Sequence, residues 1–122
     1  MNALERIGKT PASPFLTAEH EAFRDMMRRF VAAEIEPFAT QWDEAGEFPR
    51  ELYLKAGKLG ILGMGFPEEY GGTPCDRFMS MIAAQELARA GSGGVSASLK
   101  SHTIGTPPIV FGGSKELKAR VL

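Results

Sequence analysis

Ser98 and His102 are the two residues of this sequence whose types and spacing come nearest to a catalytic pair. Residues four positions apart on one helix lie side by side, so the histidine could act as the base for a serine nucleophile. The sequence offers neither a glycine-flanked elbow for the serine nor an acid placed to orient the histidine. We therefore assign no catalytic residue to this chain.

The histidines and the cysteine do not indicate a metal centre. His20 and His102 lie far apart, without the spacing of a zinc site, and each is more typical of a surface or capping residue. Cys75 has no adjoining basic residue that would activate its thiol. As the single cysteine it forms no internal disulfide, a usage that fits a reducing compartment. We assign no metal ligand.

Two glycine clusters could suggest a phosphate-binding loop. One contains Gly60, Gly63 and Gly65, and the other spans residues 91–94. Neither stands between a predicted strand and a helix, where a phosphate loop cradles its ligand, so turns and close helix packing explain them better. The residues alone therefore leave any cofactor-binding position unknown.

The composition is that of one ordinary globular domain. The chain has 122 residues, of which 43% are hydrophobic and 24% charged. Its net charge of −1 and its lack of basic runs argue against a nucleic-acid or anionic-membrane surface. The apolar runs are much shorter than the ~20 residues of a membrane span, and the first residues lack the apolar core of a signal peptide. We expect a cytoplasmic protein.

The first strong helix pattern begins at Thr17, a good N-cap residue. Residues 1–16, which contain glycine and proline, are expected to form a flexible lead. Pro37 predicts a kink or break near Glu36. An apolar stripe has helical spacing: Phe23, Met26, Met27, Phe30, Val31, Ile35 and Phe38. Charged residues fall on the other side: Arg24, Asp25, Arg28 and Arg29.

A second predicted helix starts at Pro49, which suits the first helical position, and ends before Gly60. Its inner face consists of four residues: Leu52, Tyr53, Ala56 and Leu59. Residues 61–66 are apolar but glycine-rich and could form a short extended segment. Residues 67–74 are expected to form a loop.

Two further helices follow. Asp76 caps one of them, which runs to about Arg89 and is apolar almost all round, as in a helix buried on most sides. Ser92 begins the other, which runs to about His102 and is full of small residues. Small side chains leave room beside the backbone, either for a neighbouring helix or for a ligand.

The last two predicted helices are short. One starts at Thr106 and stops at Gly112. The other starts at the N-cap Ser114 and reaches Leu122 without a stop signal, so we expect the chain to be the front part of a longer protein. No strand pattern of useful length appears. The sequence thus predicts an all-α bundle of five or six helices.

In order and spacing, five stretches resemble the N-terminal helical domain of the flavin-dependent acyl-CoA dehydrogenases. They are residues 30–38 (FVAAEIEPF), 42–50 (WDEAGEFPR), 60–72 (GILGMGFPEEYGG), 85–89 (QELAR) and 105–112 (GTPPIVFG). The resemblance covers nearly the whole chain, and the PEEYGG run is its most specific element. It implies that residues 17–122 are this domain and that they end before the family's β-domain.

The resemblance also implies an activity for the full-length protein. In the family, a base removes the proton alpha to the thioester while hydride passes from the beta carbon to FAD. Electrons then go to an electron-transfer flavoprotein. The base, usually a glutamate, and most flavin contacts come from other parts of the protein, and family members commonly form homotetramers. We expect the 122 residues alone to have no dehydrogenase activity.

Five residues match positions at which family members line or close the acyl end of the substrate pocket. They are Val95, Ser96, Leu99, Lys100 and Ile104. Ser96 leaves space, as does its neighbour Ala97, while Leu99 and Ile104 supply apolar surface. Lys100 is a departure, because an ammonium group in an apolar pocket is costly unless it meets an anion or water. It either points outward or selects an acyl chain with an acidic or polar tail.

Two alternatives stay open. The full-length protein could be an acyl-CoA oxidase-like flavoprotein on the same scaffold, which passes electrons to oxygen. The chain could instead be a non-catalytic helical module that binds a partner subunit.

Overall fold

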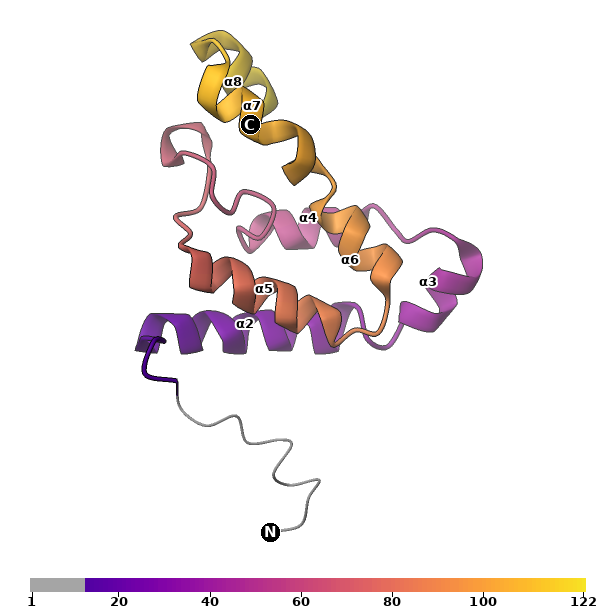
Figure 1. The fold of residues 1–122 in the computed structure, drawn as a ribbon. Coiled ribbons are helices and arrows are strands. Elements are labelled where there is room, and N and C mark those ends of the chain that lie inside the picture. The colour runs from indigo at the N-terminus through magenta and orange to yellow at the C-terminus, as the bar shows by residue number, and fades with distance from the viewer. Residues whose placement is uncertain (1–12) are drawn as a thin grey trace.

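The fold is shown in Figure 1 as a computed structural model that describes residues 13–122. Most of the expected flexible lead, residues 1–12, lies outside the described residues. The rest of it forms a turn, in which the N–H of Leu16 donates to the carbonyl oxygen of Ser13 at 3.3 Å.

The described chain is helical over most of its length. Its helices are, in order, α2 (Ala18–Glu34), α3 (Ala39–Ala45), α4 (Glu51–Lys58), the 3-10 helix η1 (Glu68–Tyr70), α5 (Arg77–Ala88), α6 (Gly93–Lys100), α7 (His102–Gly112) and α8 (Lys115–Val121). Between residues 13 and 122, β pairing is limited to one isolated bridge. The all-α prediction is confirmed. None of the helices in this part of the chain has the length and apolar character that crossing a bilayer requires.

The extended segment expected at residues 61–66 does not become a strand. Its backbone bonds close a loop instead: Gly65 N–H donates to the Thr73 carbonyl at 3.0 Å, and Thr73 N–H donates to the Gly63 carbonyl at 2.8 Å. The bridge joins Met64 to Thr73. Glycines favour such turns because they adopt backbone conformations that other residues avoid, as Gly65 does with φ 83°.

Helix α2 begins and ends where its sequence signals lie. The Thr17 hydroxyl accepts from the N–H of His20, and the His20 ring accepts in return from the N–H of Thr17, which is a capping box. At the other end, α2 stops at Glu34 and α3 starts at Ala39, on either side of Pro37. The predicted break at this proline is confirmed.

The other predicted N-caps are confirmed as well. Asp76 accepts from the N–H of Met79, Ser92 from that of Val95, and Ser114 from that of Leu117. Helix α4 is shorter than predicted at both ends, starting after Arg50. Leu52 and Ala56 are buried in it as expected, but Leu59, expected on the inner face, is 44% exposed because the helix ends before it.

Helix α7 corrects the prediction of a short helix starting at Thr106. It starts at His102, and Pro107 and Pro108 lie inside it. The two prolines stand in the middle of the helix, where each leaves an i−4 carbonyl without its backbone donor, and the Thr106 hydroxyl donates to the His102 carbonyl at 2.9 Å. Ser101 is both the last cap of α6 and the first cap of α7, so the two helices meet at one residue.

The core lies where α2 and α5 pack along each other, with α4 and α6 closing it (Figure 1). Its buried members come from all four helices and the turns after α2, α4 and α5: Met27, Phe30, Val31, Ile35, Leu52, Ala56, Ile61, Ala83, Leu87, Ala90, Val95 and Leu99. Four residues of the predicted stripe are therefore buried in the core, Phe23 and Met26 are partly buried against it, and Phe38, beyond the break at Pro37, is 41% exposed.

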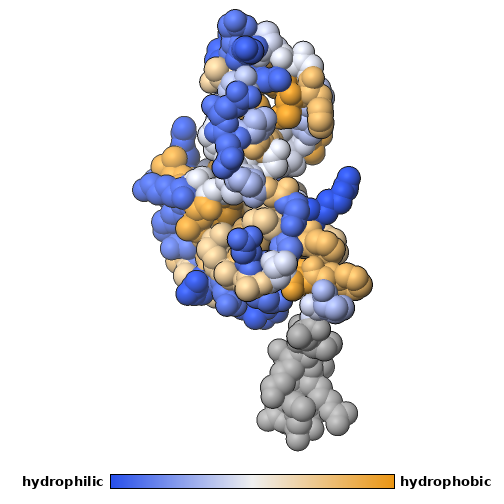
Figure 2. Space-filling model, turned by 90° about the vertical axis from the view of Figure 1, so that its left-hand side faces the viewer, coloured by the Kyte–Doolittle hydropathy of each residue, from blue (hydrophilic) through white to orange (hydrophobic). Residues whose placement is uncertain are grey.

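Helix α5 is less covered than its apolar composition suggests. Phe78 and Met81 are 40% and 56% exposed. Together with Phe15 they line a hollow on the surface beside α5. Figure 2 shows apolar surface near the beginning of the described chain. The expectation that this helix is buried on most sides is wrong, because only α2 and α6 pack against it extensively.

Candidate functional site

The candidate site is centred on α6, the helix of small residues. Its N-terminus is fixed by Ser92, whose hydroxyl accepts from the N–H of Val95 and donates to the Asp43 carboxylate at 2.6 Å. This bond attaches α6 to the end of α3. The contact with α3 therefore helps to orient α6. The side chains of α6 determine the chemical character of each of its faces.

Three of the five predicted site residues do not face solvent. Val95 and Leu99, with 3% and 1% of their surface exposed, point into the core. Ser96 is half-buried and turned towards α5, where its hydroxyl donates to the Leu87 carbonyl at 3.3 Å. A ligand bound on the exposed face of α6 would therefore contact Ser96 only at the edge of that face.

The other two predicted residues lie nearer the surface. Lys100 is half-buried, and no carboxylate between residues 13 and 122 lies within ion-pair distance of its ammonium group. Ile104, in the first turn of α7, is 83% exposed. The structure therefore does not bring the five residues together on one face.

The small residues of α6, which the sequence indicated could leave room for a neighbouring helix or a ligand, form an exposed face. Gly93, Ala97 and Ser101 are exposed and follow one another at intervals of four, so they form one stripe along α6. Lys100 and Ile104 lie beside the end of this stripe. The signal was present in the sequence as helical spacing, but the direction of the stripe depends on Val95 and Leu99 being taken up by the core.

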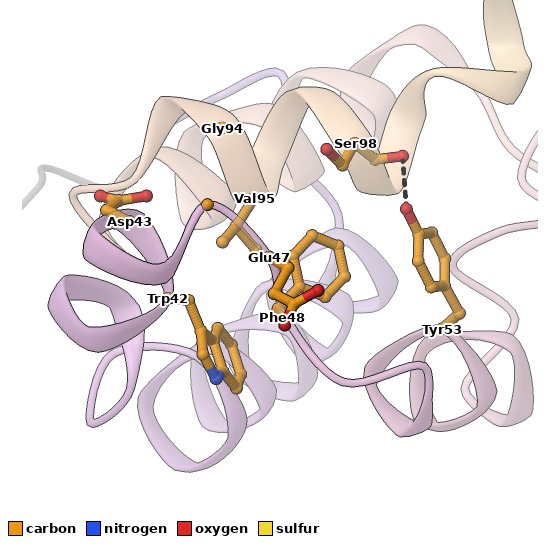
Figure 3. Close-up of a pocket in the computed structure, with 9 residues that line it drawn as sticks. Trp42, Asp43, Glu47, Phe48, Tyr53, Gly94, Val95 and Ser98 are labelled. Atoms are coloured by element: carbon orange, nitrogen blue, oxygen red, sulfur yellow. Dashed lines mark hydrogen bonds between the residues drawn. The ribbon is translucent and has the colours of Figure 1, made fainter.

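A groove opens on another side of α6, between that helix, α3 and α4 (Figure 3). Its volume is about 410 Å³, and Trp42, Phe48 and Tyr53 line it together with Gly94 and Ser98. The Tyr53 hydroxyl donates to the Ser98 carbonyl at 3.3 Å, which holds α4 against α6.

The catalytic pair rejected on sequence grounds is not formed. The Nε2 of His102 lies 2.7 Å from the Leu62 carbonyl oxygen, and its ring meets Phe66 edge-on at 6.0 Å. Since a carbonyl only accepts, we assign the proton to Nε2. His102 thus fixes the start of α7 to the turn after α4 rather than activating Ser98.

His20 was expected to be a surface or a capping residue. It is a capping residue, and it is buried. Its Nδ1 lies 3.0 Å from the Thr17 N–H, and its Nε2 lies 2.7 Å from Asp76, which caps α5. The bond from the Met79 N–H, followed by that from His20, lowers the pKa of Asp76.

A buried carboxylate, Glu86, is the most strongly bound charged group in the described chain. Only 1% of it is exposed, and Arg28 donates to it at 3.0 and 3.2 Å, Arg24 at 3.1 Å. Arg89 lies 3.5 Å away. Burial raises the pKa of Glu86, but the bonds from Arg28 and Arg24 outweigh it, so the pKa stays below its usual value. The bond to Glu86 raises the pKa of Arg28.

This cluster corrects the expected position of two arginines. Arg24 and Arg28 were expected on the outer side of α2, away from the core. They instead border the α5 side of that helix and hold Glu86 there. No local sequence pattern predicts this contact, because the partners lie about sixty residues apart.

Over residues 13–122, every buried side-chain nitrogen or oxygen has a hydrogen-bond partner, so no unpaired buried polar atom marks a place for the flavin that the resemblance implies. Over the same residues there is no group of three metal-ligating side chains. What α6 offers is a small, weakly polar surface suited to an aliphatic chain.

Comparison with known proteins identifies similar chains. The family model described as "Acyl-CoA dehydrogenase, N-terminal domain" matches residues 17–122. A probable acyl-CoA dehydrogenase of Bacillus subtilis is 38% identical over 104 residues, which are 84% of this chain and 27% of the relative. The chain thus spans about a quarter of the length of the curated relatives it matches.

Solved structures agree with the sequence matches. The structure of a probable acyl-CoA dehydrogenase from Mycobacterium abscessus superposes with a TM-score of 0.79 at 41% identity, covering 85% of this chain and 28% of that one. An acyl-CoA dehydrogenase from Bacillus anthracis complexed with FAD superposes with a TM-score of 0.78 at 35% identity. It covers 91% of this chain and 19% of that one.

Proposed function

The chain belongs to the acyl-CoA dehydrogenase family through its N-terminal domain, and on that premise we propose that it is the N-terminal part of an FAD-dependent acyl-CoA dehydrogenase. The full-length protein would remove two hydrogens from the alpha and beta carbons of an acyl-CoA thioester. The domain, taken as residues 17–122, would form one wall of the acyl site. Its own residues supply no catalytic base.

The observation that carries this proposal is the exposed stripe of α6, Gly93, Ala97 and Ser101. It lets an aliphatic chain approach the helix backbone closely, and Ile104 adds apolar surface at its end. Of the five residues expected at the site, Lys100 and Ile104 remain candidates for direct contact. Ser96 would border the chain, and Val95 and Leu99 would support the wall from inside the core.

FAD would accept the hydride, and other parts of the full-length protein would hold most of the FAD. This chain would bind the tail and exclude water from it. By resemblance to the family, we propose an electron-transfer flavoprotein as electron acceptor and a homotetramer as assembly. We also propose the cytoplasm as compartment, as the sequence analysis expects. The 122 residues alone are expected to be inactive.

The test replaces Ala97 in the full-length protein. A larger side chain on the stripe should shorten the space for the tail, so Ala97→Leu should lower kcat/KM for long acyl-CoAs more than for butyryl-CoA. One misplaced branched side chain in an apolar pocket typically costs about 10- to 100-fold in discrimination. Ala33→Leu, on the exposed outer side of α2, is the matched control.

Several outcomes would contradict the proposal. Equal effects of Ala97→Leu on all chain lengths would remove α6 from the acyl site. Absence of flavin reduction by any acyl-CoA would favour the non-catalytic interaction module. Transfer of electrons to oxygen rather than to an electron-transfer flavoprotein would identify an acyl-CoA oxidase. Turnover by the 122 residues alone would show that the domain is not merely a wall.

A further inference from the structure

We propose that the groove between α3, α4 and α6 docks a basic side chain, arginine or lysine, that another polypeptide presents. This inference goes beyond the acyl-site proposal and does not depend on it. The groove has an aromatic floor and an acidic rim. These two parts suit the aliphatic stem and the cationic head of such a side chain.

The floor is a continuous row of aromatic rings. Trp42 meets Phe48 at 5.8 Å and Phe48 meets Tyr53 at 5.2 Å between ring centroids, and Phe38, which does not line the groove, stacks on Trp42 at 5.3 Å. Figure 3 shows Trp42 and Tyr53 at the two ends of the groove with Phe48 between them. A guanidinium or ammonium group over such ring faces is attracted by their negative potential, and an aliphatic stem packs on them.

The rim adds charge of the complementary sign. Asp43 and Glu47 both line the groove and are exposed. No cation between residues 13 and 122 lies within ion-pair distance of either one. Asp43 uses one oxygen for Ser92, which fixes its place at the rim.

The basic residue nearest in sequence to Glu47 is Arg50, and it does not line the groove. Arg50 follows Phe48 by two positions, but it lines a different hollow together with Leu54 and Lys58. The acidic rim therefore lacks a counter-charge from its own segment. With a volume of about 410 Å³, the groove is within the range of ligand sites. Its elongated floor favours a long side chain over a compact free cation.

The single tryptophan of the chain makes the groove directly observable, because Trp42 lies in its floor. The 122-residue chain is titrated with a blocked five-residue peptide that has a central arginine. The same peptide with citrulline or norleucine in that place, and guanidinium chloride, serve as comparisons. Trp42 fluorescence and its indole N–H resonance report binding. A photoactivatable version of the arginine peptide is also crosslinked to the full-length protein.

The arginine peptide should shift both Trp42 signals saturably and crosslink within residues 42–53. Removing one rim charge should weaken binding by about two- to fivefold, as for one exposed ion pair, so Glu47→Gln is the test variant. Glu44→Gln, a nearby carboxylate that does not line the groove, should leave the affinity unchanged.

Any of four results would overturn the inference. Equal binding of the norleucine peptide would show an apolar groove without charge recognition. Equal binding of guanidinium chloride would show a small-cation site rather than a docking site. Absence of a saturable Trp42 signal together with absence of crosslinks in residues 42–53, or an unchanged affinity of Glu47→Gln, would show that the groove takes no basic side chain.

Discussion

The packing of α2 on α5 and the projection of α7 and α8 differ in almost every physical respect. α2 and α5 each bury four residues, and Arg24 and Arg28 of α2, which are not themselves buried, hold the buried Glu86 of α5. In α7 only Thr106 is buried, and in α8 no residue is. Figure 1 shows α7 and α8 extending away from the α2–α5 layer. Stability thus resides in one region, while the other, with Ile104 and Phe111 exposed, offers surface for contacts.

The largest test of this comparison places equivalent truncations in the two regions. Leu87→Ala, at a side chain 1% exposed, should lower the free energy of unfolding by about 2–5 kcal/mol. Ile104→Ala, at a side chain 83% exposed, should change it by less than about 0.5 kcal/mol. Urea denaturation followed by far-UV circular dichroism measures both. Similar losses in the two variants would mean that the regions are equally packed.

Glu86→Gln tests the ionic part of the α2–α5 interface. Removing a buried charge that arginines hold should cost about 2–4 kcal/mol at pH 7, somewhat less than breaking a fully buried ion pair. The folded-state pKa of Glu86 is lowered, so its contribution is complete above the usual value of 4.5 and disappears as pH falls through the lowered value. Unfolding free energies measured from pH 7 to pH 3 should therefore converge for wild type and variant.

The control for this experiment is Glu51→Gln, which removes an exposed carboxylate from α4. It should have little effect at any pH. A constant difference between wild type and Glu86→Gln down to pH 3 would show that the charge of Glu86 contributes nothing and that the loss is one of packing.

The smallest effect is expected at the joint between the two regions. His102→Ala removes the bond to the Leu62 carbonyl, and one net hydrogen bond is worth about 1 kcal/mol. His102→Gln keeps a donor of similar reach and should restore part of the loss. Hydrogen exchange should quicken in α7 and α8 but not in α2 or α5. An equal increase in hydrogen-exchange rate throughout the chain would mean that α7 and α8 do not open independently of α2 and α5.

Local signals predicted the element boundaries well. Thr17, Asp76, Ser92 and Ser114 each cap the helix that their type and position indicate, because a cap is a contact over two or three residues. The start of α7 was predicted too late, since prolines usually mark a helix start. Here they lie within it and Ser101 takes the cap.

The site was less predictable because its direction depends on distant partners. The sequence identifies α6 as a helix of small residues, but only packing against α2 and α5 decides that Val95 and Leu99 point inward and Ala97 outward. Glu86 was missed for the same reason. Nothing near it in the chain shows that Arg24 and Arg28 would surround it.

The imidazole of His20 belongs to the beginnings of two helices at once. Through Nδ1 it completes the first turn of α2, and through Nε2 it holds Asp76, which completes the first turn of α5. Fraying at one helix end therefore withdraws a partner from the other. We therefore expect these two ends, distant along the polypeptide, to open together and a proteolytic nick near either one to expose both.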